Sequence, residues 1–155
     1  MKDIVLFENS LQTEIPDDFE DMPLGLIRIM FPNEERPQII MGSPDGNAYV
    51  TFSVLEKTLT EQQLFMAAHA ARALLYKFYP SCDKQRVHII QLEDNMCGWF
   101  SFPARDMQNI MFIIAINNKM ILGTCGCAEE DFGRLEDVKK SFLSIKVLPG
   151  KEVTR

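Results

Sequence analysis

The stretch from Gln85 to Cys127 constrains the fold more than any other part of the chain. It holds four strand-length segments rich in apolar residues, and short, mostly polar connections separate each from the next. Connections this short allow hairpins but not the long crossovers that parallel strands need. The sequence therefore predicts a four-stranded antiparallel meander with strands at Arg86–Leu92, Cys97–Phe102, Asn109–Ile116 and Met120–Cys127. Met111 to Ile116 is apolar on both faces, which predicts a central strand that is covered on each side.

Further strands are expected before this meander. Residues 48–54 alternate in polarity, and Ala48, Val50, Phe52 and Val54 form one buried face. The sequence Ser-Pro-Asp-Gly at 43–46 predicts a turn, since proline presets φ and glycine accepts the left-handed position. The remaining predicted segments are a hairpin of Ile4–Phe7 and Leu11–Ile15, a strand at Gln38–Met41, and Leu24–Met30 as either a short helix or an extended piece.

Two helices are predicted. The first runs from Thr60 to Tyr79, where Thr60 and Gln63 form a capping box at its start. Its apolar stripe is expected to pack on the sheet and consists of Leu64, Ala67, Ala68, Ala71, Leu74, Leu75 and Phe78. A second amphipathic helix has the acidic residues 129–131 in its first turn, where they suit the positive end of a helix dipole. Its apolar stripe consists of Phe132, Leu135, Val138 and Phe142.

Strands that are grouped together, and do not alternate with helices, indicate the α+β class. We therefore predict an antiparallel β-sheet with two long amphipathic helices packed on it. At 155 residues the chain suits a single domain, expected over residues 1–148, with a short extended piece after Ser144-Ile145 and a frayed C-terminal tail over residues 149–155.

Charge and composition exclude several classes of function. The net charge is −6, and residues 1–66 carry 4 basic and 12 acidic side chains. Nucleic-acid binding needs a clustered basic face, so we expect no nucleic-acid partner. No apolar run approaches the roughly 18 residues of a membrane span, and no signal peptide is recognised. A cytoplasmic protein without membrane attachment is expected.

The sequence presents no catalytic constellation. His69 and His88 are the only imidazoles, and a structural or surface role is favoured for His88. Cys125 and Cys127 share one strand face, and a zinc site would need them to converge with Cys82 and Cys97. Zinc ligands usually come in closer pairs on turns, so buried free thiols are the favoured interpretation. We predict no catalytic residues, no metal and no cofactor.

One helix face is the candidate binding site. Phe65, His69, Arg72 and Tyr76 lie at about 80–140° from Leu64 around the first helix, on the side away from its alanine-leucine stripe. Aromatic residues and arginine are enriched at protein interfaces. We therefore predict a cytoplasmic adaptor or binding protein. It is expected to bind a protein partner or to associate with its own copy as a homodimer. The same face could instead be covered by a loop or by the N-terminal arm, or its aromatic rings could be scattered surface residues.

Two other interpretations stay open. The acidic cluster Glu14, Asp17, Asp18, Glu20 and Asp21 could dock a basic partner, although a solvated loop is favoured. A small-ligand carrier or an enzyme could use a cleft between the sheet and a helix. A deep polar pocket that contains His88 or a cysteine would favour that second interpretation.

The order of elements also resembles the PsbP-like fold group. The residues that carry the likeness are Ile15-Pro16 with Phe19 and Met22, Phe31-Pro32, Arg36-Pro37, the helix after the Val50–Val54 strand, the Met111–Ile116 strand and Ser144-Ile145. That group includes the photosystem II extrinsic subunit, a transport factor that binds the small GTPase Ran, and bacterial DcrB-like proteins. The resemblance implies the fold over nearly the whole chain, but it implies no common reaction and no site residue.

Overall fold

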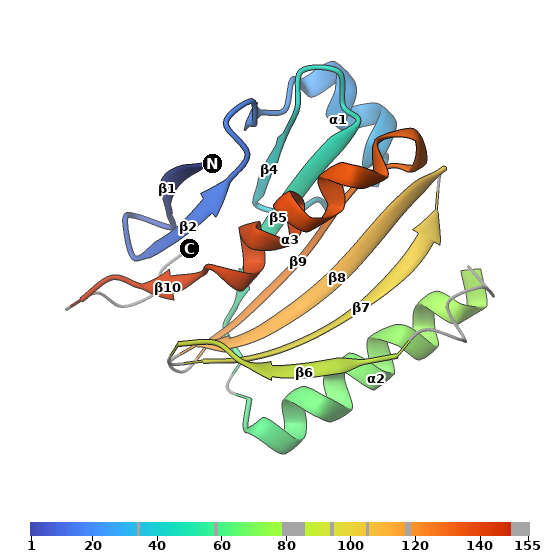
Figure 1. Cartoon of the computed structure of the whole chain (residues 1–155). Coiled ribbons are helices and arrows are strands. Elements are labelled where there is room, and N and C mark those ends of the chain that lie inside the picture. Colours follow the sequence, from blue (N-terminus) through green and yellow to red (C-terminus); the bar gives the residue numbers. More distant parts are fainter. Residues whose placement is uncertain are drawn as a thin grey trace.

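Antiparallel strands build the centre of this protein, as its computed structural model shows (Figure 1). The larger sheet has seven strands, and its last four form the expected meander. In sheet order the seven strands are β3 (Glu20–Asp21), β4 (Ile39–Gly42), β5 (Ala48–Leu55), β9 (Lys119–Ala128), β8 (Met107–Ile116), β7 (Met96–Ala104) and β6 (His88–Gln91). The structure describes residues 1–33, 35–57, 59–78, 86–93, 95–104, 106–116 and 119–149.

The N-terminal hairpin is confirmed, but it does not join the large sheet. Strands β1 (Lys2–Leu6) and β2 (Leu11–Ile15) pair with each other, and β10 (Lys146–Val147) pairs with β2. The extended piece after Ser144-Ile145 therefore completes a separate three-stranded sheet. The single sheet expected from the sequence is wrong in this respect, because the pairing of β10 with β2 depends on residues more than 130 positions apart. Of the predicted C-terminal tail, residues 150–155 lie outside the described part of the chain.

Only one of the two predicted helices is long. Helix α2 (Glu61–Phe78) has 18 residues, whereas α3 (Leu135–Leu143) has nine. A 3-10 segment, η2 (Glu129–Arg134), precedes α3. The backbone of Asp131 inside η2 is not helical, so the expected single helix is interrupted there. Phe132, expected on the buried stripe, is consequently 59% exposed. The ambiguous segment forms helix α1 (Leu24–Met30).

The helices cover opposite faces of the large sheet. Figure 1 shows α3 and the small sheet together on one face and α2 on the other. Helix α1 lies on the α2 face, where it packs beside Tyr49 and Ile40. Both faces of β5 are buried. The face predicted from the sequence is covered, and so are Tyr49 and Thr51 on the other face. The prediction that β8 is an interior strand covered on both sides is confirmed.

The main core lies between the large sheet and α3. The ring of Phe142 on α3 stacks on Phe112 of β8 at 4.7 Å between centroids, and Phe52 of β5 meets Phe112 edge-on at 5.8 Å. Gly123 of β9 lies opposite Phe112, and a Cβ there would come within 2.4 Å of the Phe112 ring. The same Cβ would lie 2.1 Å from the carbonyl oxygen of Thr51. The missing side chain thus leaves the space that the Phe112 ring fills, and the rings of Phe52 and Phe142 pack on Phe112.

The predicted turn before β5 has the expected geometry. Gly46 takes a φ of +75°, and its amide donates to the carbonyl of Ser43 at 2.9 Å. The Ser43 hydroxyl donates to a carboxylate oxygen of Asp45 at 2.6 Å, and the amide of Asn47 donates to the same oxygen at 3.0 Å. The hydrogen bond from Ser43, and to a smaller extent the one from Asn47, lower the pKa of Asp45. The turn therefore fixes the register of β4 against β5.

Replacing Phe52 with alanine tests the aromatic core. The side chain is fully buried, so we expect the substitution to lower the free energy of unfolding by roughly 3–5 kcal/mol. Denaturant unfolding of Phe52→Ala and wild type, followed by circular dichroism, measures the change. A loss below about 1 kcal/mol would mean that Phe52 does not pack in this core.

A glycine-to-alanine pair tests the space at Gly123. Gly123→Ala forces a methyl group against a backbone oxygen and an aromatic ring, and overpacking of this kind costs about 1–3 kcal/mol or more. Gly133→Ala is the matched control, because a Cβ at Gly133 has nothing within 4 Å and should change stability by less than about 1 kcal/mol. Equal unfolding midpoints for the two variants would contradict the proposed packing.

Candidate functional site

Helix α2 begins with the predicted capping box. The amide of Gln63 donates to the Thr60 hydroxyl at 3.2 Å, and the amide of Thr60 donates to the Gln63 side chain at 3.0 Å. Leu64 and Ala68 are fully buried on the sheet. They reach β7 at Gly98, where a Cβ would lie 3.3 Å from that of Ala68. A small contact zone therefore holds the long helix on the sheet.

The predicted alanine-leucine stripe is only partly correct. Ala67, Ala71 and Leu75 are half-buried, as expected for residues beside Leu64 and Ala68. Leu74 was expected in the core but is 60% exposed. The reason is geometric, because Leu74 lies about 80° from Leu64 on the side away from Ala68, the other fully buried residue, and so turns away from the sheet. Tyr79, the predicted last residue of the helix, lies outside the described residues.

The four predicted binding residues form a flank of α2 and not its far side. We call Phe65, His69, Arg72 and Tyr76 the α2 flank. Phe65 and Tyr76 are 49% and 44% exposed, whereas His69 and Arg72 are half-buried. The rings of Phe65 and His69 lie 4.3 Å apart between centroids. Their position at about 80–140° from Leu64 places them on the Ala68 side of the contact zone.

A hollow of about 740 Å³ lies at the N-terminal end of this flank. Phe65 of α2 and Ile89 of β6 supply its apolar walls, and Thr60, Glu61 and Gln62 supply the polar part of its lining. The hollow therefore joins the α2 flank to the edge strand of the sheet. The sequence pattern predicted the flank but not this neighbour, because Ile89 comes next to α2 only through the fold.

The opposite flank of α2 also exposes apolar side chains, which the sequence analysis did not single out. Met66 is 62% exposed, and a hollow of about 340 Å³ is lined by Lys57, Leu59, Gln63, Met66, Ala67 and Ala70. The i, i+4, i+8 spacing of Met66, Ala70 and Leu74 could have indicated this second flank. It carries neither an aromatic residue nor an arginine at those positions, so it is the weaker candidate by composition.

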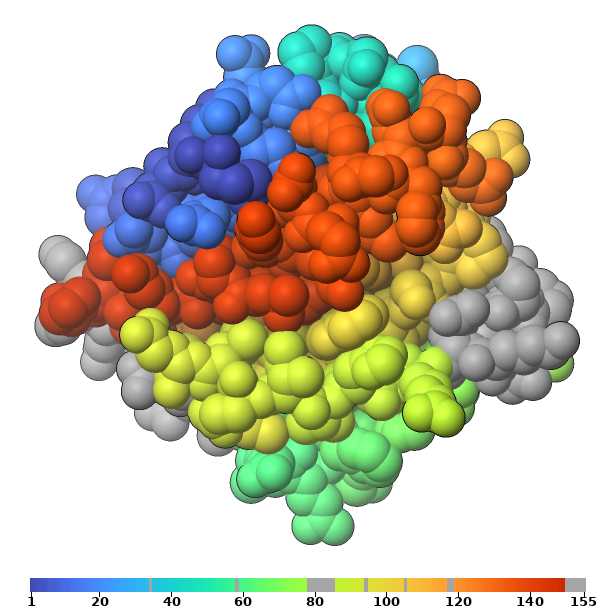
Figure 2. All heavy atoms as spheres, in the orientation of Figure 1, coloured from blue at the N-terminus to red at the C-terminus, as the bar shows by residue number. Residues whose placement is uncertain are grey.

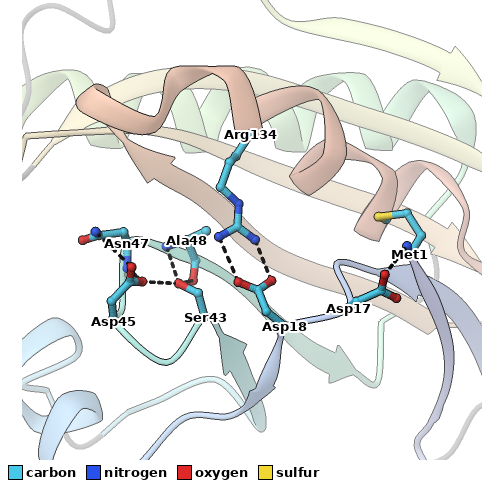
Figure 3. Close-up of polar contacts among 8 residues, drawn as sticks. All are labelled: Met1, Asp17, Asp18, Ser43, Asp45, Asn47, Ala48 and Arg134. Atoms are coloured by element: carbon cyan, nitrogen blue, oxygen red, sulfur yellow. Dashed lines mark hydrogen bonds and ion pairs between the residues drawn. The ribbon is translucent and has the colours of Figure 1, made fainter.

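The acidic N-terminal segment is solvated, as expected, but two of its carboxylates contact other parts of the chain. Figure 3 shows Asp18 facing Arg134, whose guanidinium donates to both carboxylate oxygens at 2.7 and 3.1 Å. The hydrogen bond to Asp18 is the main reason that the pKa of Arg134 is raised. Arg134 also lies 5.6 Å from the centre of the Phe19 ring, and Asp17 contacts the amino group of Met1 at 3.1 Å. The carboxylate of Asp18 thus ties this segment to η2, while all five acidic residues stay exposed.

The described cysteines lie in the core and not at the candidate site. Cys97, Cys125 and Cys127 are free and fully shielded from solvent, with the close pair on one face of β9. Burial raises the pKa of Cys97 to about 12 and also raises the pKa of the other two thiols. Among the described residues no group of three or more suitable side chains could hold a metal ion. Cys82 lies outside those residues.

The remaining candidate, His88, lies against another aromatic ring. His88 of β6 stacks on Trp99 of β7 at 4.2 Å, and Lys139 of α3 approaches the same indole at 4.7 Å. Neither His88 nor a described cysteine lines the two hollows beside α2. Neither of these two hollows is therefore the polar pocket with His88 or a cysteine that would favour an enzyme or a small-ligand carrier.

Thiol reactivity tests this placement. Because their pKa is raised, the buried cysteines hold their protons at neutral pH, and the thiol is a far weaker nucleophile than the thiolate. We expect iodoacetamide to leave Cys97, Cys125 and Cys127 unmodified in the native protein and to alkylate them after unfolding, with peptide mapping as the readout. Fast native alkylation of Cys97 would show that the core opens there.

Comparison with known proteins gives the fold but no relative by sequence. No protein-family model and no curated protein sequence matches the chain. Among solved structures, cyanobacterial PsbP (CyanoP) from Synechocystis sp. PCC 6803 superposes with a TM-score of 0.61 at 8% identity, over 95% of this chain and 92% of that one. A Bacteroides thetaiotaomicron protein gives 0.62 at 7% identity, over 97% of this chain but only 50% of its own length.

A third solved structure is also similar. LpqN, described as involved in cell envelope biogenesis of Mycobacterium tuberculosis, superposes with a TM-score of 0.51 at 9% identity, over 96% of this chain and 90% of LpqN. Identities this low carry no site residue from one chain to another. What they share with this chain is the arrangement of strands and helices over nearly its whole length. The chain has a PsbP-like fold.

Proposed function

We propose that this protein is a small, non-catalytic binding module that engages a protein surface through the α2 flank. One observation carries the proposal: the half-exposed rings of Phe65 and Tyr76 stand on the flank that ends in the apolar hollow beside Ile89. Aromatic side chains left in water add little to folding, whereas burying one is worth about 1.5–3 kcal/mol. A partner that covers the two rings would gain that free energy.

The shape of the flank favours a macromolecule over a small ligand. Small-molecule sites are concave and bury most of the ligand surface. Here the hollow occupies only the start of the helix, and Tyr76 lies three turns beyond Phe65. An opposing protein surface could contact the whole length, and the half-buried His69 and Arg72 would supply polar contacts between the two rings.

A non-catalytic role agrees with the state of the nucleophiles and bases. The described thiols are buried with raised pKa, and the ring of His88 is stacked on Trp99. The proposal includes a cytoplasmic location and no nucleic-acid partner, supported by the free thiols and by the net charge of −6. Within the described part of the chain, no helix is long and apolar enough to cross a membrane.

Paired substitutions on the two flanks of α2 test the proposal. Phe65→Ser with Tyr76→Ser removes the exposed rings, and it should leave the free energy of unfolding within about 1 kcal/mol of wild type. We expect it to abolish capture of the partner that wild type recovers from the native host. Affinity capture with quantitative mass spectrometry measures the loss.

The matched control is Met66→Ser with Leu74→Ser. These side chains are 62% and 60% exposed on the opposite flank of the same helix. The control should lose a similar amount of apolar surface and retain the partner. Loss of the partner in both double variants, or in the control alone, would contradict the assignment to the α2 flank.

A further inference from the structure

The two edges of the seven-stranded sheet differ in their protection against pairing. Strand β3 at one edge consists of two exposed acidic residues, Glu20 and Asp21. Strand β6 at the other edge has the sequence His-Ile-Ile-Gln, and its two isoleucines are half-buried. Charged residues, lysine above all, and prolines are the usual protection of an edge strand, and β6 has none of them. Figure 2 shows this segment, in yellow-green, on the surface next to α2.

The backbone groups that β6 presents outward belong to Ile89 and Gln91. Leu92 and Asn95 exchange both of their backbone hydrogen bonds at the β6–β7 turn. Bonded and non-bonded pairs alternate along an antiparallel ladder, so the next bonded pair is Ile90 with Cys97. Ile89 and Gln91 then direct their N–H and C=O groups away from β7. In the described part of the chain, no strand pairs with this edge of β6.

The same outward residue also lines the hollow beside the α2 flank. The side chain of Ile89 lies on the α2 face of the sheet, where its Cδ1 atom is 3.1 Å from the Cβ position of Gly98. A strand added to β6 would place the residue opposite Ile89 on this same face. Its side chain would enter the hollow between Ile89 and Phe65. The edge strand and the hollow therefore form one surface that fits an extended chain.

We propose that this surface binds β6 of a second copy, so that two antiparallel β6 strands join the large sheets of a symmetric dimer. The proposal rests on the proposed function and names the partner of the α2 flank. A twofold axis between the two Ile89 residues pairs them directly, and it sets Val87 opposite Gln91. The Ile89 pair and the two Val87–Gln91 pairs then use outward backbone groups and exchange six hydrogen bonds in total.

Side-chain complementarity supports this occupant. With Ile89 opposite Ile89, the two isoleucines and the two Phe65 rings lie together on the α2 face, where apolar contact favours association. The antiparallel arrangement also brings exposed Arg86 of each copy next to the end of β6 that carries exposed Glu93 of the other. One strand thus carries opposite charges at its two ends, which self-pairing matches. Interfaces this small are weak, so the dimer should form only at high protein concentration.

A proline at position 91 tests the pairing without breaking the β6–β7 ladder. Gln91→Pro removes an outward N–H, which the dimer uses twice, and proline is tolerated at such an edge position. Gln91→Ala is the matched control, because both variants lose the bonds from the Gln91 side chain to the carbonyls of Leu92 and Asn95. Sedimentation velocity over a concentration series should give dimers for wild type and Gln91→Ala. The dissociation constant should rise at least about tenfold in Gln91→Pro.

Charge reversal tests the register separately. Arg86→Glu alone should weaken the dimer roughly two- to fivefold, since Arg86 lies next to the strand end that carries Glu93 of the other copy, and adding Glu93→Arg should restore it. A wild type that stays monomeric at every concentration, or equal dimerisation of the proline and alanine variants, would overturn the proposal. If capture of a partner nevertheless requires Phe65 and Tyr76, the proposed function stands and its partner is a different protein.

Discussion

The packing of Phe112 against Gly123 is the interaction on which the rest of the architecture depends. The missing side chain at Gly123 leaves the space that the Phe112 ring needs, and Phe142 stacks on that ring from α3. The β5–β9 ladder is irregular at the same level, where the Thr124 amide donates to the hydroxyl of Thr51 at 2.9 Å. Helix α3 in turn holds the small sheet, because the Thr13 hydroxyl donates to the carbonyl of Ser141 at 2.6 Å. A side chain at position 123 would disturb each of these contacts.

This concentration of packing on one face explains why the flanks of α2 stay partly exposed. The aromatic core lies on the α3 side, while Leu64 and Ala68 are the only residues of α2 that are fully buried among those described. A helix of 18 residues needs few contacts here because Gly98 lets it approach β7 closely. Its flanks consequently extend past the contact zone. The flank next to the short edge strand β6 carries the aromatic rings, and both features meet at Ile89.

Local patterns predicted the elements, whereas long-range packing decided their surroundings. The meander, the hairpin and the capping box at Thr60 follow from alternation and from short connections, which involve neighbouring residues. The length of α3 did not follow, because its apolar spacing continues through the turn at Asp131. The attachment of the acidic segment to η2 depends on Arg134, a residue more than 100 positions away from Asp18. Likewise, helical spacing identified the α2 flank but could not reveal that Ile89 lies beside it.

Hydrogen exchange at β6 tests the central claim most directly, namely that the α2 flank and its edge strand form a surface for a second copy. The amides of His88 and Ile90 belong to the β6–β7 ladder, whereas those of Ile89 and Gln91 point outward. The account predicts that the Ile89 and Gln91 amides exchange quickly in dilute protein and become protected as the concentration rises, while His88 and Ile90 stay protected throughout. Fast exchange of Ile89 and Gln91 at every concentration would contradict it.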